Sequence, residues 1–102
     1  MDERLRLHPL VADDLQAATV WYDNISVELG NRFRNAINAV LDDIVRRPSL
    51  YGTAMDRYRF ARVRRFPYVV LFEEHTDGWI HVYGVLHGSS DPQKWLSRKA
   101  PE

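Results

Sequence analysis

The chain has 102 residues and no cysteine, and its 14 basic and 14 acidic side chains give a formal net charge of zero at pH 7. We therefore expect one small domain spanning residues 1–102, without disulfides, thiolate metal sites or a cysteine nucleophile. The sequence has no run of about 18 apolar residues and no apolar N-terminal stretch, so we expect a cytoplasmic protein with no membrane contact.

The N-terminal part of the chain predicts a short strand followed by a helix. Residues 3–7 alternate between charged and leucine side chains, which is typical of a half-buried strand. Pro9 then suits the first turn of a helix, where its missing N–H is not needed. From residue 10 to residue 25, apolar side chains recur every three or four positions. They predict one buried helical face, made of Val11, Leu15, Ala18, Tyr22 and Ile25.

A second helix is predicted from Ser26 to about Arg47. Ser26 is a suitable N-cap because its hydroxyl can accept a hydrogen bond from the first helical turn, and Pro48 ends the helical pattern. Since the connection is short, the two helices should form an antiparallel hairpin. The apolar face of the second helix is the most regular in the chain and consists of Leu29, Phe33, Ile37, Val40, Leu41 and Ile44.

After a loop at residues 48–57, the apolar period changes from helical to alternating. Residues 58–65, 68–75 and 79–87 are rich in β-branched and aromatic side chains and predict three strands. Tight turns are predicted between these strands, at Phe66-Pro67 and at Thr76-Asp77-Gly78.

A last helix is predicted to begin at Asp91 and Pro92 and to run to about Lys99, with Trp95 docking it on the sheet. The order of elements is then β-α-α-β-β-β-α. We therefore predict an α+β fold in which an antiparallel sheet carries the N-terminal helical hairpin on one face and gains the N-terminal strand as an additional strand.

Five arginines lie within residues 57–65, beside aromatic side chains, in a chain without net charge. In a continuous strand, Arg59 and Arg65 share one face, and Arg62 and Arg64 share the other. Guanidinium groups bind phosphates and carboxylates in bidentate geometry, so the cluster is a candidate binding surface for an acidic partner. The alternative is a solvated strand face whose arginine stems shield apolar surface.

Candidates for catalysis are few. His87 ends the last predicted strand beside Gly88, where it could act as a general acid or base or serve a structural role. His81 is a weaker candidate on the same strand. No pair of histidines or carboxylates has ligand spacing on a helix, and the sequence has no phosphate-binding glycine loop. We therefore expect neither a metal nor a cofactor.

Eight short motifs follow one another along the chain: His8-Pro9, Ala18-x-x-Trp21-Tyr22, Leu29-Gly30-x-Arg32-Phe33, Arg47-Pro48, Arg59, Arg65-Phe66-Pro67-Tyr68, Val85-Leu86-His87-Gly88 and Asp91-Pro92-x-x-Trp95. Each motif is weak by itself. In this order and at these separations they resemble the RelE/ParE superfamily of type II toxin–antitoxin toxins, and the resemblance runs nearly end to end.

This resemblance implies the β-α-α-β-β-β-α fold and a growth-inhibiting toxin that a cognate antitoxin neutralises. RelE-like members cleave mRNA in the ribosomal A site, whereas ParE-like members are associated with poisoning of DNA gyrase. The chain looks closer to the ParE-like, plasmid-stabilisation branch, because its last predicted helix carries Trp95 and no tyrosine follows Tyr83.

For a metal-independent ribonuclease, the resemblance implies a catalytic set of His87, Arg65 and Arg59. Where the family commonly has an arginine after the last strand, this chain has Ser90, which cannot stabilise a developing phosphate charge. We therefore favour a toxin that acts by binding a gyrase-type protein target over one that acts as an enzyme. The alternatives are a RelE-type mRNA endoribonuclease and a non-toxic, decayed antitoxin-binding module. The residues predicted to bind the target or the antitoxin are Arg59, Arg62, Arg64, Arg65 and Trp95.

Overall fold

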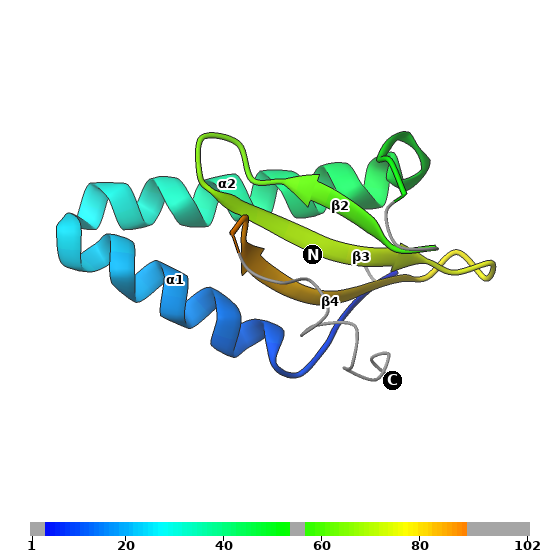
Figure 1. Cartoon of the computed structure of the whole chain (residues 1–102), viewed down its shortest axis with the longest axis horizontal. Helices are drawn as coiled ribbons and strands as arrows, with labels where there is room; N and C mark the ends of the chain where they lie inside the picture. The colour runs from blue at the N-terminus through cyan, green and yellow to red at the C-terminus, as the bar shows by residue number, and fades with distance from the viewer. Residues whose placement is uncertain (1–3, 54–56, 90–102) are drawn as a thin grey trace.

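Two helices cover one face of a four-stranded sheet in a computed structural model that describes residues 4–53 and 57–89 (Figure 1). This arrangement confirms the predicted α+β fold and the order of its elements through the last strand. The helix predicted after Asp91, with Trp95, lies outside the described residues, as does Ser90. The elements are β1 (Leu5–Leu7), α1 (Val11–Ile25), α2 (Val27–Arg46), a 3-10 turn η1 (Pro48–Leu50), β2 (Arg59–Arg62), β3 (Tyr68–Glu74) and β4 (Ile80–His87).

One residue, Ser26, separates the two helices and caps both. Its backbone N–H donates to the carbonyl of Tyr22 at the end of α1 (3.0 Å), and its hydroxyl accepts from the N–H of Leu29 in α2 (3.0 Å). Extended backbone at Ser26 reverses the chain, so the predicted N-cap and the predicted helical hairpin are confirmed.

Gly30 allows an ion pair to join the two helices. A Cβ atom at this position would lie 1.6 Å from Oδ1 of Asp23, so only a glycine leaves room for that carboxylate. Asp23 uses the space to pair with Arg34 of α2 (2.6 Å). The hairpin thereby gains an ionic contact close to its tip, where it extends past the end of the sheet (Figure 1).

The predicted face of α2 is confirmed, and that of α1 is confirmed from Val11 to Tyr22 but wrong at Ile25. Helix α1 begins at Val11 after an N-cap at Leu10, so Pro9 precedes the helix. The turn there closes without Pro9, because the N–H of Val11 donates to the carbonyl of His8 (2.9 Å). Ile25 is 62% exposed, because the tip of the hairpin lies beyond the sheet that would cover it.

The strands are arranged in the order β1-β4-β3-β2. Strands β2, β3 and β4 form the predicted antiparallel meander, and β1 adds to β4 in parallel. The β3–β4 hairpin turns at Gly78, whose φ of +91° is accessible to glycine without strain, so the predicted turn at residues 76–78 is confirmed. Asp14 of α1 ties the helical layer to the sheet by accepting from the N–H of Val85 (3.2 Å).

The second strand is shorter than the sequence predicts. It ends at Arg62, and Arg64 and Arg65 lie in the turn that leads to β3, not on the sheet. The chain turns because the N–H of Val63 donates to the carbonyl of Tyr68 (2.9 Å), which pairs the two residues across the connection. Pro67 has no N–H for a further ladder bond, so strand pairing begins after it.

A bulge opposite Leu71 and Phe72 breaks the alternation along β4. Val82 pairs with Phe72 and Gly84 with Leu71, so Tyr83 is the additional residue. As a result, His81, Tyr83 and His87 do not share one face, although they stand an even number of residues apart in the sequence. His81 and Tyr83 lie on the face away from the helices, and His87 contacts Tyr68 on the helical face.

The main core lies between the helices and the sheet, and aromatic rings fill one end of it. Phe33 of α2 is fully buried, and its ring centroid lies 5.0 Å from that of Tyr22, 5.1 Å from Phe66 and 5.4 Å from Tyr68. These tilted and edge-on contacts join α1, α2, the β2–β3 turn and β3. A smaller cluster of Leu71, Tyr83 and Leu86 is buried on the other face of the sheet.

Replacing Phe33 with alanine should lower the free energy of unfolding by about 3–5 kcal/mol, because the substitution leaves a cavity among three aromatic rings. Trp21→Ala is the control, since Trp21 is 66% exposed on the adjacent helix, and it should change stability by less than about 1 kcal/mol. Urea unfolding followed by circular dichroism measures both values. Equal losses for the two variants would contradict this description of the core.

Candidate partner-binding site

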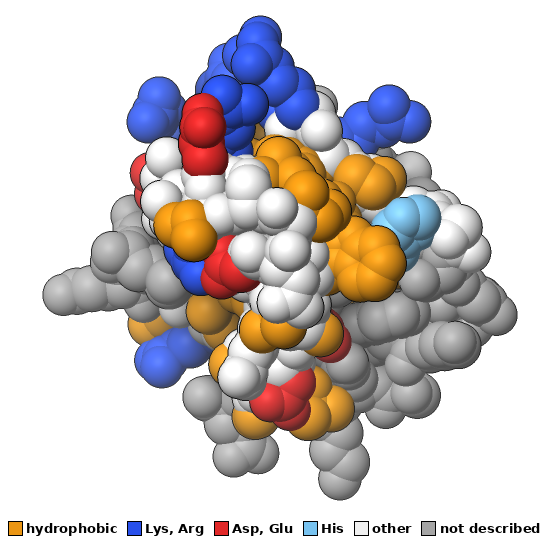
Figure 2. Space-filling model, turned by 90° about the vertical axis from the view of Figure 1, so that its left-hand side faces the viewer, with side chains coloured by type: hydrophobic (Ala, Val, Ile, Leu, Met, Phe, Trp, Pro, Cys, Tyr) orange, Lys and Arg blue, Asp and Glu red, His pale blue; other side chains and the backbone are white. Residues whose placement is uncertain are grey.

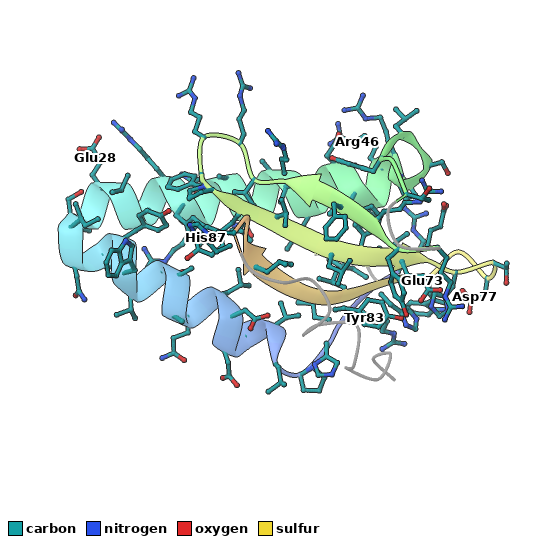
Figure 3. All side chains as sticks on the ribbon, viewed as in Figure 1. Glu28, Arg46, Glu73, Asp77, Tyr83 and His87 are labelled. Carbon is teal, nitrogen blue, oxygen red and sulfur yellow. The ribbon has the colours of Figure 1, made fainter. Side chains whose placement is uncertain are left out.

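The connection between β2 and β3 places arginines at the surface over an aromatic anchor. We call residues 62–67 the arginine turn. The turn is closed by a bond from the N–H of Phe66 to the carbonyl of Val63 (3.1 Å), and Arg65 adopts a left-handed backbone with φ of +71°. The ring of Phe66 points inward to Tyr22 (4.9 Å), while the side chains at the tip of the turn extend away from the sheet (Figure 3).

The five clustered arginines fall into two groups by their contacts. Arg57 pairs with Glu73, and Arg59 donates to the carbonyl of Tyr51 and lies 3.9 Å from a carboxylate oxygen of Glu74. These two arginines are therefore engaged by other groups of the fold. The other three are exposed and form no ion pair with the described part of the chain: Arg62, Arg64 and Arg65.

A groove of about 1090 Å³ runs between α2 and the arginine turn, and we call it the α2 groove. Apolar side chains from α2 and the ring of Phe66 form much of its lining, and the arginines of the turn form one edge. Seen from the tip of the helical hairpin, basic side chains gather at the top of the molecule and hydrophobic side chains lie below them (Figure 2). The groove therefore combines apolar surface with positive charge.

A second hollow of about 600 Å³ lies between the arginine turn and the end of β4. The N–H of Gly88 donates to the carbonyl of Pro67 (2.8 Å), which fixes these two segments side by side. His87 is exposed here, with its ring 5.4 Å from that of Tyr68 and its Nδ1 2.7 Å from Oγ of Ser89. The end of β4 and the arginine turn thus share one surface.

The structure does not bring the three predicted catalytic residues together. Arg59 pairs with Phe72 and His87 pairs with Tyr68, so their positions are four residues apart along β3, or about 13 Å. Arg65 lies in the turn close to the β4 end, whereas Arg59 is engaged with Tyr51 and Glu74. Of the predicted set, only His87 and Arg65 border the same end of the sheet.

A buried carboxylate at the opposite end of the sheet was not identified from the sequence. Glu73 is 5% exposed, and its Oε1 accepts from the hydroxyl of Tyr83 (2.6 Å) and lies 3.0 Å from Nε2 of His75. Arg57 pairs with its other oxygen. The ring of His75 stacks on that of His81 at 3.7 Å. Glu73 and His75 are two residues apart in the sequence, but Tyr83 and His81 join them only through the pairing of β3 with β4, and Arg57 reaches Glu73 from before β2.

These contacts shift the pKa values of the cluster. Burial raises the pKa of Glu73, but the hydrogen bond from Tyr83 and the charges of His75 and Arg57 outweigh burial and leave the pKa below its ordinary value. Burial, and then the neighbouring His75, lower the pKa of His81. Burial and the bond to Glu73 raise the pKa of Tyr83. The cluster joins both strands of the β3–β4 hairpin to Arg57, away from the arginine turn (Figure 3).

Among the described residues, no group of three or more histidines and carboxylates is arranged to hold a metal ion, and no helix is long and apolar enough to cross a membrane.

Comparison with known proteins identifies relatives along nearly the whole chain. Residues 5–92 match the family model described as ParE toxin of type II toxin–antitoxin system, parDE. The chain is 32% identical over 93 residues to Toxin ParE2 of Mycobacterium tuberculosis, from strain CDC 1551 / Oshkosh and from strain ATCC 25618 / H37Rv. Each alignment covers 90% of this chain and 88% of the relative.

Acid should destabilise the fold, beginning near neutral pH. His81 has a folded pKa below its ordinary value of 6.5, so the unfolded chain binds the proton more readily. Its contribution to stability is complete above pH 6.5 and is lost as the pH falls towards the folded pKa. Glu73 adds a second loss below its ordinary value of 4.5, because its folded pKa is also depressed.

A series of melting temperatures measured in buffers from about pH 7.5 to about pH 4 tests this expectation, which is a fall in melting temperature with pH. His81→Phe keeps a ring on His75 but cannot titrate, so it should flatten the upper part of the profile. His87→Ala removes an exposed histidine and should leave the profile unchanged. If the melting temperature of the wild type does not change down to about pH 5, or if both substitutions have equal effects, His81 is not the source of the pH dependence.

Proposed function

Because the chain belongs to the ParE toxin family, it is the toxin of a type II toxin–antitoxin system with a cognate antitoxin as its partner, and we propose that it inhibits growth by binding a gyrase-type protein target in the cytoplasm. The observation that carries this proposal is the surface of the arginine turn. Three exposed cations stand there over apolar side chains, without ion pairs to the described residues. Such a surface is suited to an acidic region of another protein.

The geometry of the polar side chains also favours binding over catalysis. Metal-independent RNA cleavage needs a base, an acid and a cation around one phosphate. Arg59 is held by Tyr51 and Glu74, about 13 Å along β3 from the position of His87. The buried Glu73 is saturated by its own donors at the far end of the sheet. None of these groups can join His87 without a rearrangement.

One observation favours a ribonuclease of the RelE type as the second candidate. The bond between Gly88 and Pro67 holds the exposed His87 close to the arginine turn, beside the hollow that Arg65 lines. In that function His87 would transfer a proton and Arg65 would stabilise the phosphate charge. The chain would then be an enzyme whose toxicity requires His87, whereas a toxin that only binds its target does not require this side chain.

Induced expression in a growing culture separates these functions. We expect growth arrest with chromosome damage and intact mRNA, and we expect His87→Ala to arrest growth as the wild type does. Replacing Arg62, Arg64 and Arg65 with glutamine should raise survival by at least about tenfold, since charged contacts at a protein interface are worth this much. Arg46→Gln changes an exposed arginine on α2 outside both hollows and should have no effect.

Survival counts, mRNA 5′ ends and DNA breaks, measured in the same cultures, distinguish the gyrase-type toxin from the ribonuclease. Cleaved mRNA in the wild type, together with loss of arrest in His87→Ala, would replace the proposal with the ribonuclease. A folded wild-type chain that causes no arrest would indicate the decayed antitoxin-binding module.

A further inference from the structure

We propose that Arg65 is the specificity-determining cation of the target-binding surface, where its guanidinium binds a carboxylate of the protein target. This inference deepens the proposed function and rests on it. It starts from the backbone of the arginine turn, because Arg65 is the only residue other than glycine that has a positive φ among the described residues. The fold therefore places an arginine where the backbone disfavours one.

Residues 63–66 have the features of a type II turn. The N–H of Phe66 donates to the carbonyl of Val63 (3.1 Å), and of the two residues between them only Arg65 has a positive φ, of +71°. The third position of a type II turn requires a positive φ and is normally occupied by glycine or asparagine. The Cβ atom of an arginine crowds the backbone in this region, so glycine would relieve strain here.

The two ends of the turn impose this backbone. Val63, at the first position, is 2% exposed, and the ring of Phe66, at the last position, packs 4.9 Å from that of Tyr22. The N–H of Val63 also donates to the carbonyl of Tyr68 (2.9 Å), which fixes the turn relative to β3. Because the core holds both ends, the residues between them cannot relax to an ordinary φ without moving an anchor.

The side chain of Arg65 does not repay the fold for this strain. It is exposed and forms neither an ion pair nor a hydrogen bond with the described part of the chain. Arg62 and Arg64 are exposed too, but their backbones accept an arginine. Arg62 ends β2 opposite Val69, and Arg64 has no positive φ. Of the three cations, Arg65 alone conflicts with its own backbone, so its contribution lies in a contact outside the chain.

The same constraint makes Arg65 a preorganised donor. A backbone fixed in the left-handed region presents the side chain from one direction, so less conformational freedom is lost when a partner binds. Arg65 lines both the α2 groove and the hollow at the end of β4, so its ligand lies where these two surfaces meet. A guanidinium binds a carboxylate through two parallel N–H···O bonds, and a protein target supplies that carboxylate from an acidic side chain.

Replacement of Arg65 by glycine tests the strain. Arg65→Gly removes the strained Cβ atom, so we expect the melting temperature to rise by about 2–4 °C. Arg64→Gly is the matched control, because it removes the same side chain from the preceding position of the same turn. It should lower the melting temperature by a similar amount, since glycine adds freedom to the unfolded chain and relieves no strain there. A melting temperature of Arg65→Gly at or below that of the wild type would overturn the proposal.

Growth arrest after induced expression tests the contact with the target. We expect Arg65→Gly to raise survival by at least about tenfold and Arg64→Gly to raise it by less than about threefold. Because Arg65→Gly should be more stable than the wild type, unfolding and degradation cannot explain its loss of toxicity.

A second substitution separates the missing guanidinium from the flexibility of glycine. Asparagine tolerates the left-handed region but is less flexible than glycine, so Arg65→Asn should raise survival as much as Arg65→Gly does. If Arg65→Asn is as toxic as the wild type, a flexible turn explains the result and the role of Arg65 is wrong.

The wild type in the same cultures separates this inference from the proposed function. If the wild type arrests growth with intact mRNA and Arg65→Gly arrests it equally, the proposed function stands and the role of Arg65 is wrong. If the wild type causes no arrest, the proposed function is wrong, and so is the inference that rests on it. If the wild type cleaves mRNA and Arg65→Gly does not, Arg65 binds a phosphate of RNA and both proposals are wrong.

Discussion

The packing of Phe66 into the aromatic cluster determines where the positive charge of the molecule stands. Its ring meets Tyr22 of α1 and Phe33 of α2, and both of these rings also contact Tyr68 at the start of β3. Phe66 and the fully buried Val63 are the two apolar side chains that hold the β2–β3 connection in the main core. The same cluster reaches His87 through Tyr68. One set of rings thus positions the arginine turn, the α2 groove and the end of β4.

The distribution of ion pairs then explains how a chain of zero net charge can present a cationic surface. Acidic side chains neutralise arginines at several places in the molecule, including Asp43 at the end of α2 and Glu73 at the far end of the sheet. The arginine turn receives none of these carboxylates from the described residues. Attraction of an acidic partner is therefore a local property of the surface and does not follow from the overall charge.

Much of the fold could be predicted because its elements rest on local patterns. The apolar face of α2 follows helical spacing, Ser26 has the chemistry of an N-cap, and Gly78 supplies a positive φ to a short hairpin. The length of β2 could not be predicted in this way. Alternation through Arg65 is equally compatible with a strand, and the left-handed backbone of an arginine has no sequence signal.

The sequence indicated which arginines could form a binding surface, but it did not indicate how they are arranged in the fold. Clustered arginines indicated a binding surface. Which of them form ion pairs within the described part of the chain depends on where Glu73, Glu74 and the carbonyl of Tyr51 lie after folding. The α2 groove combines residues that are far apart in the sequence, so no motif reveals it. The bulge in β4 likewise separates His81 from His87 onto opposite faces, and it depends on pairing between strands.

The central claim is that an aromatic anchor, and not the arginines alone, creates the partner-binding surface. The most direct test is the Kd of the antitoxin for Phe66→Ala, a variant that keeps every arginine. Because the arginine turn loses one of its two apolar anchors and keeps only Val63, we expect the Kd to rise by roughly tenfold while circular dichroism reports a folded protein. An unchanged Kd in the folded variant would contradict the claim, since the charges would then suffice without their anchor.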